Sequence, residues 1–191
     1  MLLAASVGSV LNMSRFANDL GVAVSTIKKW ISVLEASYII FLLPSYTQNR
    51  RKNIVKSPKI YFYDNGLVTY LCGISTRELF ERGPMAGALF ENYIIAEVWK
   101  EMINLPRPHV LSFYKQQRGL EIDLIIEDHS SRQLIEVKNS ATFRKKMIEP
   151  MEQFMEKGDQ GFLVYQGDDL PYVDEIKIVN YKHFLPKSHK P

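Results

Sequence analysis

The chain has 191 residues, enough for one medium domain or two small ones, and its 46% hydrophobic and 24% charged residues are ordinary for a soluble globular protein. Its longest apolar runs, such as Tyr38–Leu43, are far shorter than the roughly 20 residues of a membrane-spanning helix, so no membrane partner is expected. One cysteine, Cys72, excludes an internal disulfide and favours a cytoplasmic location. The four histidines lack ligand spacing, which argues against a zinc site.

The net charge of +3 is unevenly distributed along the chain. Residues 1–60 carry eight basic and two acidic side chains, so this part has an excess of six positive charges and the remainder is mildly acidic. A basic module ahead of an acidic one is the asymmetry expected if the first part meets a polyanion.

Two short helices separated by a glycine turn are predicted near the start of the chain. The first covers Met13–Leu20, with Asn12 or Ser14 as its cap and Gly21 at its C-terminal end. The second runs from Ser25–Thr26 to about Ala36. Its apolar face is formed by Ile27, Trp30, Ile31 and Leu34. This spacing is typical of a helix-turn-helix.

A hairpin follows the two helices. Tyr38–Leu43 and Lys59–Tyr63 are predicted strands, and Asn49–Asn53 is a basic turn between them, which together resemble the wing of a winged helix. The functional interpretation is DNA binding through the exposed face of the second helix and through phosphate contacts of the turn. The candidate residues are Thr26, Lys28, Lys29, Arg50, Arg51 and Lys52. The alternative is a protein-interaction or linker module of the same shape.

A connector and a long helix come next. Residues 64–83 contain two predicted helical pieces, Gly66–Leu71 and Thr76–Glu81, and Pro84 begins a helix that reaches about Met102. One stripe of this helix holds Gly87, Glu91, Ile94, Ile95 and Val98. A carboxylate on an apolar stripe is unusual because an uncompensated buried charge is costly. The alternative is a glutamate at the stripe edge that reaches water.

The strands Val110–Tyr114, Leu120–Glu127 and Gln133–Lys138 form the most informative part of the sequence. A turn centred between His129 and Ser130 places Asp123 directly opposite Glu136, and Glu121 opposite Lys138. Strand alternation predicts one face with Glu121, Asp123, Ile125, Leu134, Glu136 and Lys138. The predicted core face holds Ile122, Leu124, Ile126, Ile135 and Val137.

Directly opposed carboxylates repel each other, and a divalent cation removes that repulsion. Oxygen ligands favour Mg²⁺ or Mn²⁺, so Asp123 and Glu136 are candidate metal ligands and Lys138 is a candidate for stabilising developing charge or orienting water. The alternative is a solvated face on which Glu121 pairs with Lys138 and no metal binds.

The last part of the chain is predicted to complete a sheet. A helix over Phe143–Lys157, capped by Thr142, directs Met147, Met151, Phe154 and Met155 toward the sheet as core residues. The strands Gly161–Tyr165 and Glu175–Val179 follow, and residues 186–191 read as a tail. The basic side chains of Arg144, Lys145 and Lys146 are interpreted as a solvated helix end.

The segments GALFENYIIAE, KQQRGLEIDLIIE and LIEVKNSAT resemble the PD-(D/E)xK nuclease superfamily. In particular they resemble domain of unknown function 4143, which follows the ATPase module in many prokaryotic AAA-type proteins. LNMSRFANDLGVAVSTIKKWISVLEASYIIFLLPSY and KSPKIYFYDNGL resemble the winged-helix portion of the same proteins. The resemblance implies an α/β (α+β) chain. Its parts are a winged helix-turn-helix at 1–63, a connector at 64–83, a restriction-endonuclease-like mixed sheet flanked by helices at 84–185, and the tail.

The resemblance also implies a catalytic set of Glu91, Asp123, Glu136 and Lys138, with metal held by Asp123, Glu136 and Glu91. The sequence lacks the motif G-x-x-x-x-G-K-[ST], so ATP is not expected to bind and the ATPase module is an expected partner, with Leu2–Leu11 as a helix continuing from it. Two functions stay open. One is metal-dependent phosphodiester hydrolysis, with DNA as the expected nucleic acid. The other is an inactive DNA- or protein-binding module that targets the ATPase.

Overall fold

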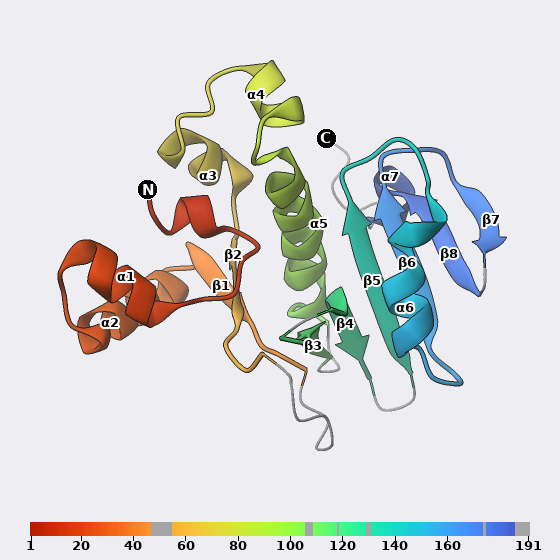
Figure 1. Ribbon diagram of the computed structural model, residues 1–191, viewed down its shortest axis with the longest axis horizontal. Helices are drawn as coiled ribbons and strands as arrows, with labels where there is room; N and C mark the ends of the chain where they lie inside the picture. The colour runs from red at the N-terminus through yellow and green to blue at the C-terminus, as the bar shows by residue number, and fades with distance from the viewer. Residues whose placement is uncertain (47–54, 106–108, 118, 129–130, 174, 186–191) are drawn as a thin grey trace. The chain divides into compact units, whose positions relative to one another are not determined.

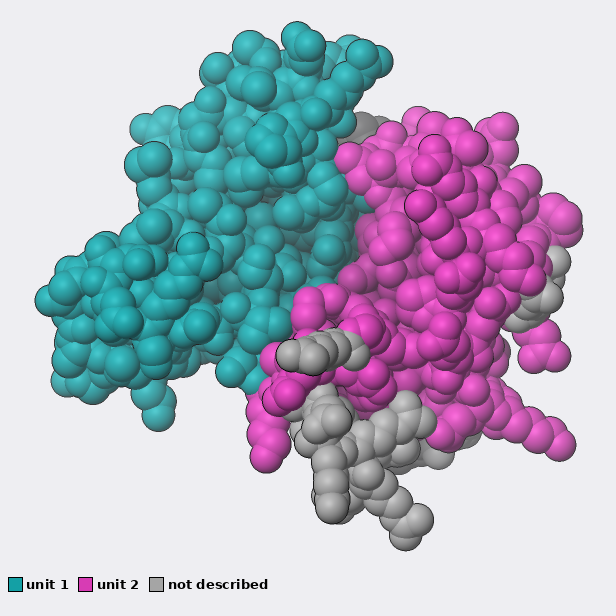
Figure 2. All heavy atoms as spheres, viewed as in Figure 1, with its two compact units in different colours: residues 1–44, 57–96 teal, residues 45–56, 97–191 magenta. Residues whose placement is uncertain are grey.

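The computed structural model describes residues 1–46, 55–105, 109–117, 119–128, 131–173 and 175–185 (Figure 1). Helices precede a six-stranded mixed sheet, and a separate two-stranded sheet lies in the first half of the chain, so the predicted α+β fold class is confirmed. The chain forms two compact units (Figure 2). The first contains residues 1–44 and 57–96, and the second contains residues 45–56 and 97–191. The finer division into winged helix, connector and nuclease-like domain stays a prediction.

The first two helices form where the sequence predicts them. In α1 (Met13–Leu20), the side chain of Asn12 accepts a hydrogen bond of 2.9 Å from the backbone of Arg15, and Gly21 ends the helix with φ = 66°. Helix α2 (Val24–Ala36) buries Ile27 and Ile31 against α1 and the hairpin. Both helices are therefore defined by local signals and by one apolar face.

The N-terminal segment differs from the prediction. The expected helix over Leu2–Leu11 is wrong, because the chain forms a single 3₁₀ turn (Ala4–Ser6), turns again at Val7 and Gly8, and makes an isolated bridge from Val10 to Lys59. Gly8 has φ = +73°, and its amide donates to the carbonyl of Ile60 at 2.8 Å. The amide of Ile60 donates in turn to the carbonyl of Ser9 at 3.0 Å. Backbone pairing beside the hairpin thus outweighs helix formation in this segment.

The hairpin consists of β1 (Ile40–Leu43) and β2 (Lys59–Phe62), paired antiparallel from Ile40–Phe62 to Leu43–Lys59. The predicted basic turn Asn49–Asn53, with Arg50, Arg51 and Lys52, lies outside the described residues. Two short helices follow, α3 (Asn65–Leu71) and α4 (Arg77–Arg82), close to their predicted bounds. Helix α5 (Ala86–Met102) starts two residues after the predicted Pro84 and ends as predicted.

The sheet of the second unit has the strand order β3-β4-β5-β6-β8-β7. Its strands are β3 (Val110–Lys115), β4 (Glu121–Glu127), β5 (Arg132–Lys138), β6 (Gln160–Tyr165), β7 (Leu170–Val173) and β8 (Ile176–Asn180). Strands β3, β4 and β5 are antiparallel, β5, β6 and β8 are parallel, and β7 adds an antiparallel edge that the sequence did not predict. Helix α7 (Tyr181–Phe184) follows β8 and was also not predicted.

The predicted helix over Phe143–Lys157 is wrong in extent. The segment forms a 3₁₀ turn (Lys145–Met147) and then α6 (Glu149–Phe154). Pro150 accounts for the late start, because it lies in the first turn of α6 and lacks the backbone N–H that a helix begun at Phe143 would need at this position. The predicted packing is nevertheless confirmed, since Met151 and Phe154 are buried in the core and Met147 and Met155 pack against it.

One arginine links the start of β5 to two other parts of the second unit. The guanidinium of Arg132 donates to both carboxylate oxygens of Asp159, at 2.9 and 2.5 Å, and to the hydroxyl of Tyr46 at 2.9 Å. The hydrogen bond to Asp159 is the main reason why the pKa of Arg132 lies above its usual value. The amide of Tyr46 also donates to the carbonyl of Phe113, which attaches the segment around Tyr46 to the edge strand β3.

Gly21 and Gly87 allow the effect of backbone strain on stability to be measured apart from the effect of side-chain contacts. A Cβ atom added at Gly21 or at Gly87 meets nothing within 4 Å, but only Gly21 of the two has a left-handed φ, at +66°. We expect Gly21→Ala to lower the free energy of unfolding by about 1–2 kcal/mol. Gly87→Ala is the matched control and should leave stability unchanged or raise it. Urea denaturation of both variants checks this, and equal stabilities would contradict it.

Candidate functional site

The β4–β5 hairpin has the predicted register. Leu124 pairs with Ile135 and Ile125 with Leu134, as a turn centred between His129 and Ser130 requires. Beyond the paired residues, the side chain of Asp123 replaces a backbone carbonyl as the acceptor for β5. The carboxylate of Asp123 accepts a hydrogen bond of 3.0 Å from the amide of Val137. Asp123 is therefore fixed by the backbone of the neighbouring strand.

Three predicted site residues lie together at this point. Asp123 and Glu136 are 6% and 4% exposed, so both carboxylates are buried. The Nζ atom of Lys138 lies 4.0 Å from Oδ2 of Asp123 and is in closer contact with Oε1 of Glu136. Both carboxylates thus converge on one ammonium group. This cation stabilises the pair electrostatically, as buried charges require.

The predicted alternation of faces along β4 is wrong at Ile122. Ile122 was placed on one face and Ile125 on the other, but both pack in one cluster with Leu134. The reason is a register shift between β3 and β4, where Ser112 pairs with Ile125 but Tyr114 pairs with Ile122.

The predicted solvation of this face in the alternative is wrong, because Asp123 and Glu136 are buried. The carboxylate of Glu121, which that alternative pairs with Lys138, lies 2.5 Å from the ammonium group of Lys115 on β3.

The site lies at the carboxyl end of the parallel strands (Figure 1). Lys138 pairs with Tyr165, the last residue of β6, and Tyr165 pairs with Asn180, the last residue of β8. The loop after β5 is held in place, since the amide of Gln166 donates to the carbonyl of Ser140 at 3.0 Å. The side-chain amide of Asn180 donates to the carbonyl of Gly167 at 2.6 Å. Gln166 and Asn180 were not predicted, although polar residues at strand ends were a usable signal.

Glu91 belongs to the first unit and has its own partners there. Its Oε1 accepts a hydrogen bond of 2.6 Å from the hydroxyl of Tyr61 and lies 3.1 Å from Nζ of Lys59. The side chain of Lys59 is only 3% exposed, whereas that of Glu91 is 20% exposed. Its role as a metal ligand stays a prediction.

Asn92, next to Glu91, is a structural residue that the sequence reasoning missed. It is 1% exposed, and its side chain accepts from the amide of Phe62 at 2.8 Å and donates to the carbonyl of Phe62 at 3.0 Å. It also donates to the side chain of Asn65 at 2.7 Å. Asn92 thus extends the edge of β2 as a backbone strand would. A polar residue inside an apolar helix was the available signal.

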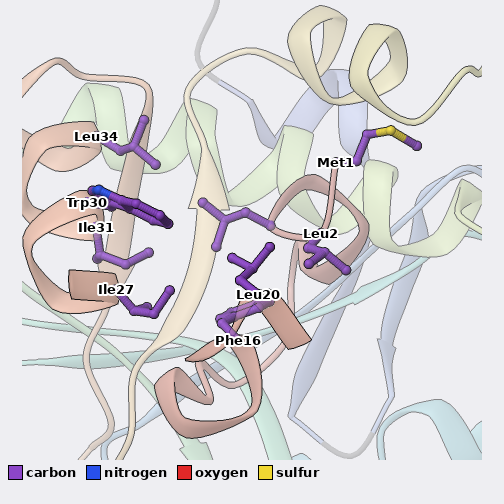
Figure 3. A pocket seen from close by; sticks show the side chains of 9 residues that line it. Met1, Leu2, Phe16, Leu20, Ile27, Trp30, Ile31 and Leu34 are labelled. Carbon is purple, nitrogen blue, oxygen red and sulfur yellow. The ribbon is translucent and has the colours of Figure 1, made fainter. Parts of the chain in front are cut away.

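The candidate DNA-binding residues of α2 are accessible in part. Lys28 and Lys29 are exposed and Thr26 is half-buried. The same helix contributes to an apolar pocket of about 340 Å³ between the N-terminal segment, α1 and α2 (Figure 3). Trp30, which the sequence places on the apolar face of the helix, lines this pocket and is 49% exposed.

Two absences apply to the described part of the chain. Among the described residues, no group of three or more His, Cys, Asp or Glu side chains is arranged to hold a metal ion. Within the same residues, no helix has the length and apolar character needed to cross a bilayer.

Comparison with known proteins identifies the family. The profile described as "Domain of unknown function (DUF4143)" matches residues 86–184, just over half of the chain. The chain belongs to the DUF4143 family. A second profile, "Domain of unknown function (DUF8612)", matches residues 1–78. The predicted resemblance to domain of unknown function 4143 is therefore confirmed.

The matched relatives and the matched solved structure do not assign a function to this chain. Uncharacterized proteins of Mycobacterium tuberculosis and Mycobacterium bovis are each 29% identical over 135 residues, covering 71% of this chain and 30% of the relative. The DUF4143 chain thus spans 30% of the length of these relatives. The structure of Can2 from Sulfobacillus thermosulfidooxidans in complex with cyclic tetra-adenylate aligns with a TM-score of 0.32 and 13% identity, over 78% of this chain and 41% of Can2. A likeness at this level carries no argument.

The charge cluster makes a prediction about stability. Lys138→Met removes the ammonium group that both buried carboxylates contact, so we expect the free energy of unfolding at pH 8 to fall by about 2 kcal/mol. Urea denaturation of the wild type and the variant at this pH measures the difference. A variant as stable as the wild type would contradict the account.

Proposed function

We propose that the second unit of this DUF4143 protein contains a nuclease-like site. This site would hydrolyse phosphodiester bonds of nucleic acid with the help of a divalent metal ion. The observation that carries this proposal is the convergence of two buried carboxylates, Asp123 and Glu136, on the ammonium group of Lys138. The resemblance of LEIDLIIE and LIEVKNSAT to the PD-(D/E)xK superfamily supports the same assignment.

The residues fit a hard divalent cation. Mg²⁺ is commonly bound through one or two carboxylates, with water and substrate phosphate completing the shell. Asp123 and Glu136 supply two carboxylates on neighbouring strands, and the hydrogen bond from the amide of Val137 holds Asp123 in place. A cluster of three protein ligands is therefore not required.

Each residue has a separate part in the proposed reaction. Mg²⁺ or Mn²⁺, when bound, would polarise the phosphate and activate water. Asp123 and Glu136 would hold the cation at the carboxyl end of β5. Lys138 would donate to a phosphate oxygen and stabilise the charge that develops there. The loop fixed by Gln166 and Asn180 would keep the backbone at Lys138 from moving during this step.

We further propose that this unit acts within a longer AAA-type ATPase. The resemblance to such proteins supports this placement. The match covers 30% of each mycobacterial relative, so the remaining length of these relatives is sufficient for an ATPase module. The sequence has no G-x-x-x-x-G-K-[ST] loop, so ATP hydrolysis would come from outside this chain.

Cleavage assays test the nuclease proposal. With Mg²⁺ or Mn²⁺, the wild type should cleave DNA or RNA, and Asp123→Asn and Glu136→Gln should each lose on the order of 100-fold or more in rate. Glu121→Gln is the matched control. It removes a carboxylate from the same strand as Asp123, but this carboxylate pairs with Lys115 and not with Lys138. It should keep near-normal activity.

No cleavage of any nucleic acid by the wild type, even when joined to an ATPase module, would refute catalysis. Equal activity in the control and in Asp123→Asn would refute the assignment of the site.

A second candidate is an inactive module that targets its ATPase to nucleic acid. The observation in its favour is that Lys138 already compensates both buried carboxylates. In this function, Lys28 and Lys29 on α2 would contact phosphates, together with Thr26 and the turn residues Arg50, Arg51 and Lys52.

Salt dependence tests this second candidate. If Lys28 and Lys29 contact phosphates, replacing both by serine should reduce the log–log slope of DNA affinity against salt by about two. Replacing Arg77 and Arg82 of α4 by serine is the control for a general loss of positive charge, and should change the slope less. Equal effects of the two double variants would argue against α2 as the contact surface.

A further inference from the structure

The position of Lys138 has a consequence for metal binding. Its ammonium group lies within ion-pair distance of both carboxylates that the proposed function assigns to the metal. A divalent cation bound by the same oxygens would lie within a few ångströms of the positively charged ammonium group of Lys138. The repulsion between the two cations is strongly unfavourable in a partly buried site. The ammonium group and the metal therefore compete for Asp123 and Glu136.

Lys138 can leave this position without unfolding the site. Its backbone is fixed, because Lys138 pairs with Tyr165 and the next loop is bonded to Gln166. Its side chain, by contrast, is 37% exposed, whereas Asp123 and Glu136 are buried. A rotation of the side chain toward solvent would uncover both carboxylates. A phosphate of the substrate offers the ammonium group a new anionic partner.

We propose that Lys138 is a built-in counter-cation that keeps metal affinity low until a nucleic-acid phosphate draws it away. This inference rests on the proposed function and adds its regulation. Metal and nucleic acid then bind cooperatively, because each favours the same displaced position of Lys138. By linkage, the phosphate raises metal affinity by the same factor as the metal raises phosphate affinity. A site of this kind holds little metal in the absence of substrate.

Equilibrium binding of Mn²⁺ to the whole chain tests the proposal without relying on cleavage. Lys138→Met and Lys138→Gln should each bind Mn²⁺ about tenfold tighter than the wild type, because the competing cation is gone. Lys115→Met is a matched control, since Lys115 has the same 37% exposure and pairs with Glu121 on the same sheet. Its Mn²⁺ affinity should stay close to that of the wild type.

Two further measurements sharpen the result. Mn²⁺ should raise the melting temperature of Lys138→Met more than that of the wild type, which also shows that the variant is folded. A phosphorothioate oligonucleotide, which resists cleavage, should increase Mn²⁺ affinity more in the wild type than in Lys138→Met.

The outcomes separate this inference from the proposed function. Mn²⁺ binding that is equal in all four proteins, or weaker in the Lys138 variants, overturns the competition and leaves the metal site standing. No Mn²⁺ binding by any of them, with or without the oligonucleotide, overturns the metal site itself.

Discussion

The charge balance among Asp123, Glu136 and Lys138 is the constraint on which the second unit depends. Two carboxylates on neighbouring strands are buried in the sheet, a position that would be strongly unfavourable without a cation. Lys138, two residues along β5, supplies the cation from the same strand. The spacing of Glu136 and Lys138 therefore has a structural reason that is independent of catalysis, since it brings the ammonium group to the buried carboxylate. The same spacing places that ammonium group where the proposed chemistry needs it.

The rest of the second unit holds this cluster in position. At the far end of β5, Arg132 binds Asp159 and Tyr46, so the strand is anchored where it begins. At the near end, Gln166 and Asn180 fix the loops that follow the parallel strands. Gly167 allows these loops to approach each other, because a Cβ atom there would lie 2.4 Å from the carbonyl oxygen of Ala141. Within this frame the side chain of Lys138 is the most exposed of the three, at 37%.

The parts that could be predicted are those with short-range causes. The cap at Asn12, the left-handed Gly21 and the register of the β4–β5 hairpin each follow from a few neighbouring residues, and the structure has all three. The predicted helix over Phe143–Lys157 is too long because its apolar periodicity continues across Pro150, which lies in the first turn of the shorter helix α6.

The remaining failures have long-range causes. The bulge between β3 and β4, which moves Ile122 to the face of Ile125, depends on a pairing that the sequence of one strand does not contain. Asn92 has its partners about 30 residues away, so its role could not be read from the helix alone. The convergence of Asp123, Glu136 and Lys138 could be expected from register, but the burial of both carboxylates could not, because it depends on the packing of both sheet faces.

A crystal structure with Mn²⁺, read by anomalous scattering, tests the central claim most directly. The account predicts an anomalous peak between the carboxylates of Asp123 and Glu136, with the ammonium group of Lys138 displaced from both. Crystals soaked in Mn²⁺ that show no peak there, while Lys138 still contacts both carboxylates, would contradict the account and leave the cluster as a structural ion pair.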